Sequence, residues 1–324
     1  MKKVLALNKE PYIISRASTA FQLGAVQISP NYSDALLCSK FINLRYLPED
    51  KIRCDFLHKD FWFTSAKMFI RQSLLFSKET LQLDSFDVIK YIISAINDGN
   101  YVTGDFNAYY IPDKIEYEII NKRDTYLIYG YDLLNECFYL MGDTIHGYGS
   151  HEVRFEDYIN SISNRDDGMF NINIMQYNPE FSFDFSKEKL YKNLNNYVLS
   201  FDEDVLHNLV SPQYGLDAIR QLKADILVDY GRGQLIRDKS FLVLCEHKKI
   251  MVLRLKYLND HTDIHVGALI HLAEENYRLS KDILQYCRMY INDNDLHAYP
   301  LIVDLLQQLI DNDEIICNNA LARL

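Results

Sequence analysis

The chain has 324 residues, 48% of them hydrophobic and 13% aromatic, which is enough apolar material for one large or two ordinary domains. Its 34 Lys and Arg residues and 45 Asp and Glu residues give a net charge of −11. That charge argues against a nucleic-acid binder that depends on a general basic surface. The 24 Tyr and 17 Phe residues, beside only 12 Gly and 7 Pro, exclude a disordered or low-complexity chain.

The start of the chain predicts no targeting segment. The apolar residues Val4 to Leu7 are followed at once by Asn8, Lys9 and Glu10, so a secretory signal is not expected. No uncharged apolar run approaches the ~18 residues of a membrane span. The six cysteines are scattered and form no CxxC pair, which is typical of reduced thiols. We therefore expect a cytoplasmic protein.

Two helices are predicted in the first half of the chain. Ser29-Pro30 is a suitable helix start, and the buried stripe expected after it is Leu37, Phe41 and Leu44. The second helix is predicted from Asp84-Ser85 to a stop at Gly99, with an apolar face of Ile89, Ile92, Ile93 and Ile96.

Three short segments rich in aromatic or β-branched residues then predict strands. They are residues 101–105, 125–131 and 137–142, and the last two are joined by the hairpin-like sequence DLLNE. From about Phe185 onward the pattern is that of long helices. The prediction is an α+β fold with residues 1–175 as a mixed domain and residues 176–324 as an all-helical domain.

The segment from Gly104 to Asp143 carries a family resemblance. Its distinctive features are Asp105 with Tyr109, Tyr110 and Pro112, then Gly130-Tyr131-Asp132, then a strand that ends at Asp143. In their order and spacing these residues resemble the N-terminal domain of the butirosin-biosynthesis H-type proteins, a branch of the papain-like cysteine peptidase superfamily. The resemblance covers about the first half, and the helical second half is similar to an extension found in related antibiotic-cluster proteins.

The resemblance implies a papain-like fold and a specific chemistry. In the family, a Cys at a helix N-terminus accepts an acyl group, a His acts as its base and an Asp orients the His; a helix N-terminus and a paired imidazole both activate a thiol. The implied activity is acyl transfer from a carrier-protein thioester to an amine. The implied partners are an acyl or peptidyl carrier protein with its phosphopantetheine thioester and an amine-bearing small molecule. No metal or other cofactor is implied.

This sequence departs from the family pattern at the catalytic positions. The resemblance places the nucleophile at Tyr32 and the base at Asp124, six residues before Gly130, while Asp143 keeps the orienting position. The nearest thiol is Cys38, an alternative nucleophile, but it lies close to the predicted buried stripe and is expected to be a core residue. Cys54 has Arg53 and His58 near it in a loop-like segment, which we interpret as coincidence.

Several other residues have two interpretations. Asp124 and Asp143 could form a carboxylate pair that acts as a base or holds an ammonium group, or they could be two solvated acids. Asp105, Tyr109 and Tyr110 could line a substrate cleft, or the tyrosines could pack while Asp105 caps a turn. The remaining residues receive structural interpretations: His146 and His151 in a solvated loop, Glu246 with Arg254 as an ion pair or docking surface, and Tyr230 to Gln234 as a turn.

Three functions follow as hypotheses. The first is an acyl- or amide-forming transferase of nonribosomal-peptide or aminoglycoside-like biosynthesis, in which the amine attacks the bound thioester directly or uses a rewired nucleophile. The second is a pseudoenzyme that acts as a binding or adaptor module. The third is a cysteine peptidase that uses Cys38 or Cys54. An acidic chain suits a basic small molecule better than an acidic carrier protein.

Overall fold

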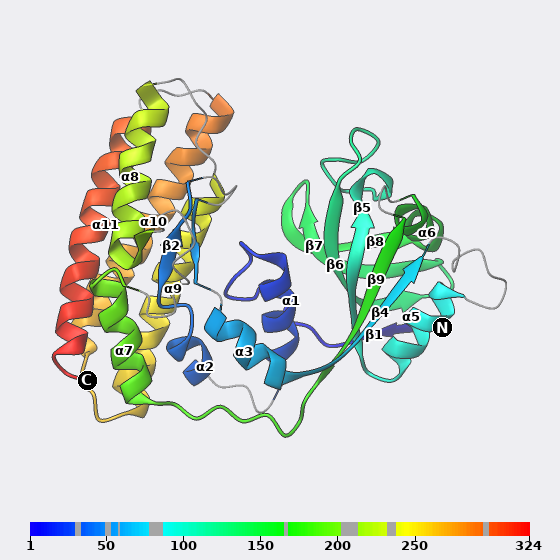
Figure 1. Ribbon diagram of the computed structural model, residues 1–324, viewed down its shortest axis with the longest axis horizontal. Coiled ribbons are helices and arrows are strands. Elements are labelled where there is room, and N and C mark those ends of the chain that lie inside the picture. The colour runs from blue at the N-terminus through cyan, green and yellow to red at the C-terminus, as the bar shows by residue number, and fades with distance from the viewer. Residues whose placement is uncertain are drawn as a thin grey trace. The chain divides into compact units, whose positions relative to one another are not determined.

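A seven-stranded antiparallel sheet organises one part of the computed structural model, which describes residues 1–29, 34–48, 53–57, 59–77, 87–164, 168–201, 213–231, 238–293 and 298–324. The chain divides into two units. The sheet unit is Met1–Tyr32 with Phe63–Ser182, and the helical unit is Ser33–Trp62 with Phe183–Leu324. The protein is thus α+β, with helices in its C-terminal half (Figure 1).

The strands of the sheet unit pair in the order β4-β9-β5-β6-β7-β8, and β1 also pairs with β6. The first half of β6 pairs with β5, whereas its last residues pair with β1 and β7. A register shift between Ile128 and Gly130 leaves Tyr129 as a bulge. The bounds are β1 (Lys2–Val4), β4 (Phe69–Ser77), β5 (Tyr101–Asn107), β6 (Arg123–Asp132), β7 (Cys137–Thr144), β8 (Gly147–Arg154) and β9 (Met169–Tyr177).

The three predicted strands are confirmed as β5, β6 and β7, and the predicted hairpin joins the last two. These segments are short and rich in aromatic and β-branched residues, which favour strands. The segment DTIHGYGSHE differs from the prediction of a solvated loop. Residues 147–152 of this segment belong to β8, and all eight residues of β8 pair with β7.

The predicted second helix is confirmed as α5 (Val88–Asn97), with residues 84–86 outside the described part of the chain. Asp87 caps its N-terminus by accepting from the backbone N–H of Lys90 at 3.1 Å. Gly99 follows its last turn at φ +83°, a left-handed conformation that favours glycine. The other helices within the sheet unit are α1 (Ala17–Val26), the 3₁₀ turn η1 (Ala108–Tyr110) and α6 (Phe155–Ser163).

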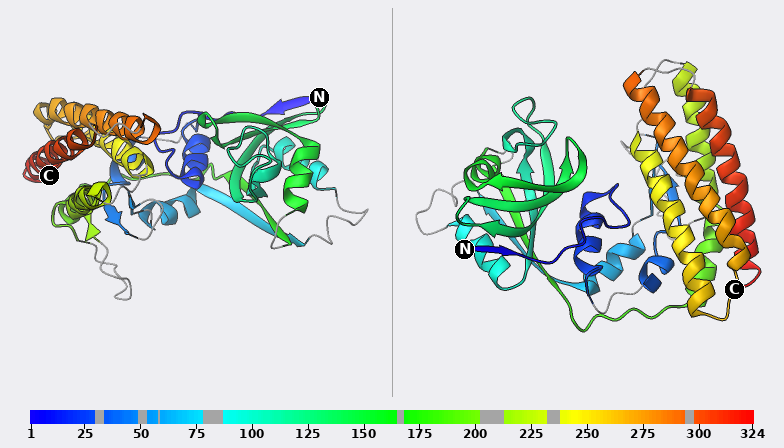
Figure 2. Two further views of the ribbon diagram at one scale, coloured as in Figure 1. Left: turned by 90° about the horizontal axis from the view of Figure 1, so that it is seen from above. Right: turned by 180° about the vertical axis from the view of Figure 1, so that it is seen from behind.

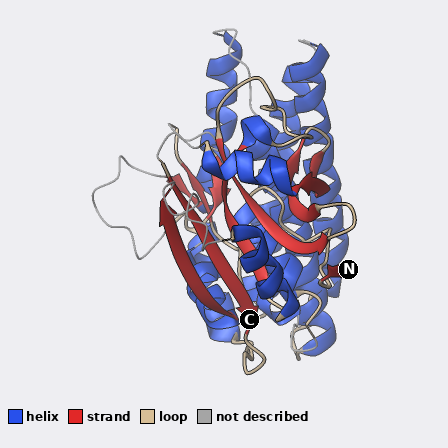
Figure 3. Ribbon diagram, turned by 90° about the vertical axis from the view of Figure 1, so that its right-hand side faces the viewer, coloured by secondary structure: helices blue, strands red, loops and turns tan. Residues whose placement is uncertain are grey.

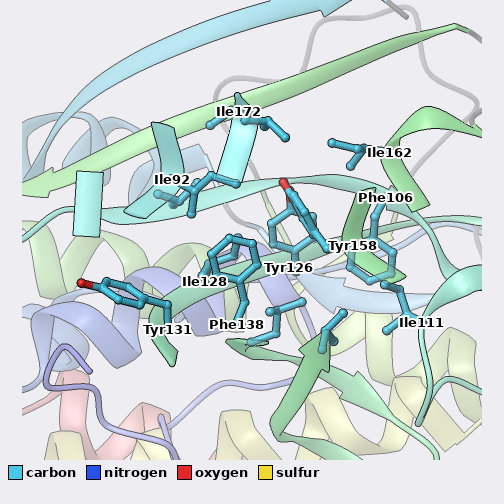
Figure 4. Packing of buried hydrophobic residues seen from close by; sticks show 14 of the residues in the cluster. Ile92, Phe106, Ile111, Tyr126, Ile128, Tyr131, Phe138, Tyr158, Ile162 and Ile172 are labelled. Carbon is cyan, nitrogen blue, oxygen red and sulfur yellow. The ribbon is translucent and has the colours of Figure 1, made fainter. Parts of the chain in front are cut away.

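One face of the sheet packs against α5 and α6 to form the core shown in Figure 4. Its centre is aromatic: the rings of Phe106 and Tyr126 stack with centroids 5.0 Å apart, and the Tyr126 hydroxyl lies 2.5 Å from that of Tyr158 in α6. These rings are fully buried, and each hydroxyl satisfies the other. The tyrosine-rich composition of the strands is therefore explained by core packing.

The opposite face of the sheet carries α1. Phe21 of α1 contacts the ring of Tyr148 in β8, with centroids 6.3 Å apart. Gly24 of the same helix lies so close to the Asn8 backbone that an added Cβ would be 2.8 Å from that carbonyl oxygen. Because side chains alternate along each strand, neighbouring residues of β6, β7 and β8 point to either α1 or α5 and α6.

The helical unit contains long helices that pack side by side (Figure 2). Helix α10 packs against both α9 and α11, and α8 packs against α11. A small antiparallel sheet of order β10-β2-β3 belongs to the same unit. Figure 3 shows the helices of the protein in blue and its strands in red. The bounds are α2 (Asp34–Ser39), β2 (Leu44–Tyr46), β3 (Cys54–Phe56), α7 (Lys187–Val198), β10 (Gln213–Tyr214), α8 (Gly215–Gly231), α9 (Asp238–His261), α10 (Gly267–Asp293) and α11 (Ala298–Leu321). Helix α3 (Lys59–Met68) contains one of the three points where the chain passes between the units.

Two predictions about this part of the chain are wrong. The C-terminal half is not all-helical, because β10 pairs with β2 from the first half. The predicted stripe from Leu37 to Leu44 is also not one helix: α2 ends at Ser39, Phe41 takes a left-handed φ of +56°, and Leu44 begins β2. Leu44 is buried, but through strand pairing with Phe56 of β3 instead of helical packing. Tyr230 and Gly231 end α8 where a turn was predicted, and residues 232–234 lie outside the described part.

Among the described residues, no helix has both the length and the apolar character needed to cross a membrane.

Candidate functional site

The strand register places Asp124 and Asp143 on opposite faces of the sheet. Asp124 lies opposite Phe106 of β5, whose side chain is in the core beneath α5 and α6. Asp143 lies opposite Tyr148 of β8, whose ring contacts α1. Continuing the pairing of Leu127 with Met141 by two residues brings Thr125, the neighbour of Asp124, opposite Asp143. The carboxylate pair considered from the sequence is therefore not formed.

Asp124 belongs to a cluster that we call the Lys114 cluster, made of Lys114, Asp124 and His151, in which Lys114 and His151 are buried and Asp124 is partly exposed. The Lys114 ammonium lies 2.6 Å from Asp124 Oδ2, and the lysine side chain is 2% exposed. The ammonium also lies 5.1 Å from the centre of the Phe106 ring. The other carboxylate oxygen, Oδ1, accepts from the backbone N–H of Thr125 at 2.8 Å. Asp124 therefore faces an ammonium group, but this group belongs to Lys114 of the same chain.

His151 completes this cluster from β8. It lies opposite Leu140, on the core face, and is 6% exposed. Neither ring nitrogen has a hydrogen-bond partner among the described residues. Burial, reinforced by the Lys114 charge, lowers the pKa of His151 to about 4, while Asp113, the Gly149 backbone and Asp124 act in the opposite direction. His151 is therefore a neutral core imidazole, and its assignment to a solvated loop is wrong.

The face toward α1 carries a second polar group, the Asp143 row, made of Asp105, Arg123, Asp143 and Tyr148. Asp105 lies opposite Thr125 in the register and accepts from Arg123 Nε at 3.0 Å. Tyr148 lies opposite Asp143, and burial together with that carboxylate raises the pKa of the phenol well above its usual value. Two of the sequence-predicted residues, Asp105 and Asp143, thus share one face of the sheet.

Tyr109 and Tyr110 form η1 at the end of β5, with their rings edge to face at 4.9 Å. The residue that caps this turn is Asn107, not Asp105. Its side-chain oxygen accepts from the backbone N–H groups of Tyr109 at 3.1 Å and Lys122 at 3.3 Å. An Asn directly before a turn is a recognisable capping pattern in a sequence.

The helix on the Asp143 face begins at Ala17, with Arg16 at its N-cap position and no side-chain cap. Tyr32, where the resemblance places the nucleophile, lies outside the described residues. The helix start on this face reads Ser15-Arg16-Ala17 and contains no cysteine. A thiol at a helix N-terminus, which the family chemistry uses, is thus absent from α1.

The six cysteines are free, and burial raises the pKa of each thiol. The pKa rises to about 12 for Cys38 and for Cys54, the two alternative nucleophiles. Both are fully buried, Cys38 in α2 and Cys54 in β3 instead of a loop. Cys38 is confirmed as a core residue. Thiolate formation is disfavoured at every cysteine, whereas a catalytic cysteine needs the opposite shift.

A second polar centre lies inside the helical unit. We call it the buried charge network, made of Tyr197, His247, Lys248, Asn276 and Asp313, all at most 1% exposed. Lys248 forms an ion pair with Asp313 Oδ2. The same oxygen accepts from the Tyr197 hydroxyl at 2.6 Å, and Oδ1 accepts from Asn276 Nδ2 at 2.7 Å. Every Asp313 oxygen is therefore hydrogen-bonded, as a buried carboxylate requires.

The histidine of this network has a defined tautomer. His247 Nε2 lies 2.8 Å from the carbonyl oxygen of Ile42, which can only accept, so Nε2 carries the proton. Nδ1 then accepts from Lys248 at 3.1 Å. Burial and the Lys248 charge hold the pKa of His247 well below its usual value, in agreement with a neutral ring. All five side chains are buried and both oxygens of Asp313 are hydrogen-bonded, so we interpret the network as structural.

Arg254, expected to share an ion pair or a docking face with Glu246, has other partners. Its guanidinium is fully buried and donates to the carbonyl oxygens of Cys38 at 2.7 Å and Lys40 at 3.0 Å. It therefore joins α9 to the end of α2 through backbone contacts and presents no docking surface.

Within the described part of the chain, no group of three or more His, Cys, Asp and Glu side chains is arranged to hold a metal ion. Compared with models of protein families and with curated proteins, the chain matches none.

Proposed function

We propose that the sheet unit is a papain-like domain, similar to the butirosin H-type proteins, that has lost cysteine catalysis. In this proposal the chain is a cytoplasmic binding module of natural-product biosynthesis, and its ligand is an amine-bearing small molecule. An antiparallel sheet with a helix on the face of Asp143 supports this assignment, as does the hairpin of β6 and β7. The free cysteines support a reducing compartment.

The observation that carries the proposal is the ion pair between Lys114 and Asp124. The resemblance expects a base at position 124, but the carboxylate there is neutralised by an ammonium 2.6 Å away. That ammonium is itself buried, so removing its partner would leave an uncompensated charge in the core. Asp124 is therefore needed to balance the charge of Lys114. With all thiol pKa values raised, neither a nucleophile nor its base is available among these residues.

The peptidase hypothesis is the least supported of the three. Cys38 and Cys54 both lie in the helical unit, are buried, and have pKa values raised to about 12. A peptidase nucleophile must reach a substrate carbonyl as a thiolate, which neither environment favours.

Amide-forming transfer is a second candidate, favoured by one observation. His151 is neutral and its ring nitrogens have no partner among the described residues, so it has the protonation state of a general base. In such a reaction the amine nitrogen would attack the thioester carbonyl of a carrier-bound acyl group. The C–N bond forms, the C–S bond breaks, and the amine proton passes through the imidazole to the sulfur of the leaving phosphopantetheine thiol. Catalysis would require His151 to become accessible.

Two measurements on the full chain test the proposal. The first follows each cysteine with iodoacetamide from pH 5 to 9 by mass spectrometry, and we expect slow labelling at all six sites. The second mixes the protein with the N-acetylcysteamine thioester of glycine and with spermidine. We expect no amide above the protein-free rate, and the same result for His151→Gln. Amide formation that the His151→Gln variant loses would refute the noncatalytic proposal and establish the transferase. A fast-labelling Cys38 or Cys54 would refute it in favour of cysteine chemistry.

A further inference from the structure

A cavity of about 350 Å³ lies in the sheet unit, beside the C-terminal end of α5. We call it the α5 pocket. Strands β4 and β9 supply one side of it, because Gln72 pairs with Ile174 and Ile70 with Gln176, so that all four residues line the same cavity. Helix α5 and the turn after it supply the other side. The volume lies within the range of pockets that hold small molecules.

The charge of the α5 pocket favours a cation. Among the residues that the structure describes, Asp98 is the one charged residue lining it, and neither Lys nor Arg does so. Asp98 is also the C-cap of α5, where the helix dipole places partial negative charge. The same helix end already binds one ammonium: Lys3 Nζ donates to the carbonyl oxygen of Asn97 at 2.6 Å. Within the described part of the chain the pocket thus offers the Asp98 carboxylate and no lining cation.

The neutral lining residues favour a hydrogen-bond donor with an apolar chain. Asn100 lines the pocket, and a side-chain amide can hydrogen-bond to a ligand. The ring of Tyr91 and the side chains of Ile70 and Ile174 supply an aromatic and aliphatic surface for methylene groups. Tyr91 can also attract a cation through its ring.

We propose that the α5 pocket binds a linear alkylammonium ligand of the polyamine class, with one ammonium at Asp98 and a nitrogen donor toward Asn100. The ligand class rests on the proposed function, which expects an amine-bearing small molecule, whereas the location rests on the pocket itself. The site is separate from the Lys114 cluster and from the Asp143 row, since none of their residues lines it. Binding here requires no catalytic group.

Isothermal titration of the full chain with spermidine at low ionic strength tests the proposal. Asp98→Asn removes the carboxylate charge, and Ser94→Phe places a bulky ring at an exposed lining position of the pocket. The matched control is Asp87→Asn, which removes the same charge from the opposite end of α5 while Asn retains the N-capping ability. Triethylene glycol, a neutral chain, is the matched probe for the ammonium groups.

We expect spermidine to bind the wild-type chain and the Asp87→Asn control alike, and triethylene glycol not to bind. Loss of the charge-assisted contact in Asp98→Asn should weaken spermidine binding by about tenfold or more, and Ser94→Phe should weaken it further. If spermidine binds all three variants as tightly as the wild type, the α5 pocket is refuted while the amine-binding function stands. If spermidine does not bind the wild-type chain, both the pocket and its ligand class are refuted.

Discussion

Replacing Asp313 by Asn should destabilise the helical unit strongly. The substitution keeps the shape of the side chain but removes the negative charge, and Lys248 then remains 1% exposed with no anionic partner in the network. Asp313 also accepts from Tyr197 and Asn276, so the network around it loses charge-assisted bonds as well. Breaking a buried pair from one side costs about 3–5 kcal/mol. A typical domain has a net stability of only ~5–15 kcal/mol, so the change should be large.

The measurement is urea unfolding followed by circular dichroism at 222 nm, a wavelength that follows mainly the helices α7 to α11. The matched control is Asp304→Asn on the same helix, α11, where the side chain is exposed. That control should change the free energy of unfolding by less than ~0.5 kcal/mol. The comparison requires similar slopes against urea, because a changed slope would report a different unfolded or native state.

A double-mutant cycle separates the charge effect from lost packing. Lys248→Met in the Asp313→Asn background removes the stranded ammonium while keeping an unbranched side chain. We expect this double variant to be more stable than Asp313→Asn alone by a few kcal/mol, because no uncompensated charge is left in the core. An Asp313→Asn variant as stable as Asp304→Asn, or a double variant that recovers nothing, would refute the reasoning from the buried charge network.

Two further predictions concern the sheet unit. Burial lowers the pKa of His151 in the folded protein to about 4, whereas the usual value in an unfolded chain is 6.5. As the pH falls below 6.5, the histidine of the unfolded chain therefore becomes protonated first. The free energy of unfolding should be constant above that pH and should decrease toward pH 4 by up to about 3 kcal/mol. His151→Gln should remove that part of the pH dependence, measured as the difference between the two stability profiles, and parallel profiles would contradict the assignment. Gly104→Ala should cost ~1–3 kcal/mol in urea unfolding, since its Cβ would lie 2.6 Å from the Asn171 backbone oxygen. Gly149→Ala, with nothing within 4 Å of its Cβ, is the control, and equal effects of both substitutions would show that close packing at Gly104 is unimportant.

Local patterns in the sequence predict much of the sheet unit. The three strands are recognisable from their short runs of aromatic and β-branched residues, and α5 from its apolar face, its following Gly99 and its acidic start. These features depend on neighbours within a few residues, so they can be read without the tertiary fold. The division of the chain was harder to read. Residues 33–62 join the helical unit through β2 and β3, and nothing local in Leu44 to Tyr46 indicates pairing with residues 213–214.

The positions of the candidate site residues depend on the strand register, which the spacing of residues along the sequence does not determine. A shift of one residue moves a strand side chain to the other face, and β6 contains such a shift at Tyr129. Asp124, which lies six residues before Gly130 in the sequence, faces the core, whereas the residue opposite Asp143 in the strand register is Thr125. Lys114 could not be found in this way, because it comes from the connection after η1 and reaches Asp124 only in the folded chain.

The buried charge network could have been predicted from the sequence. On α11 the buried positions Leu306, Leu309, Ile310 and Ile316 mark one helical stripe, and Asp313 lies on the same stripe. An acid on an apolar stripe must be neutral or paired, since an isolated buried carboxylate is too costly. On α9, Lys248 lies on a comparable buried stripe and supplies the opposite charge. Interrupted stripes of opposite charge on two long helices thus predict an internal ion pair, in which Asp313 is the acid and Lys248 or Arg254 of α9 is the candidate base.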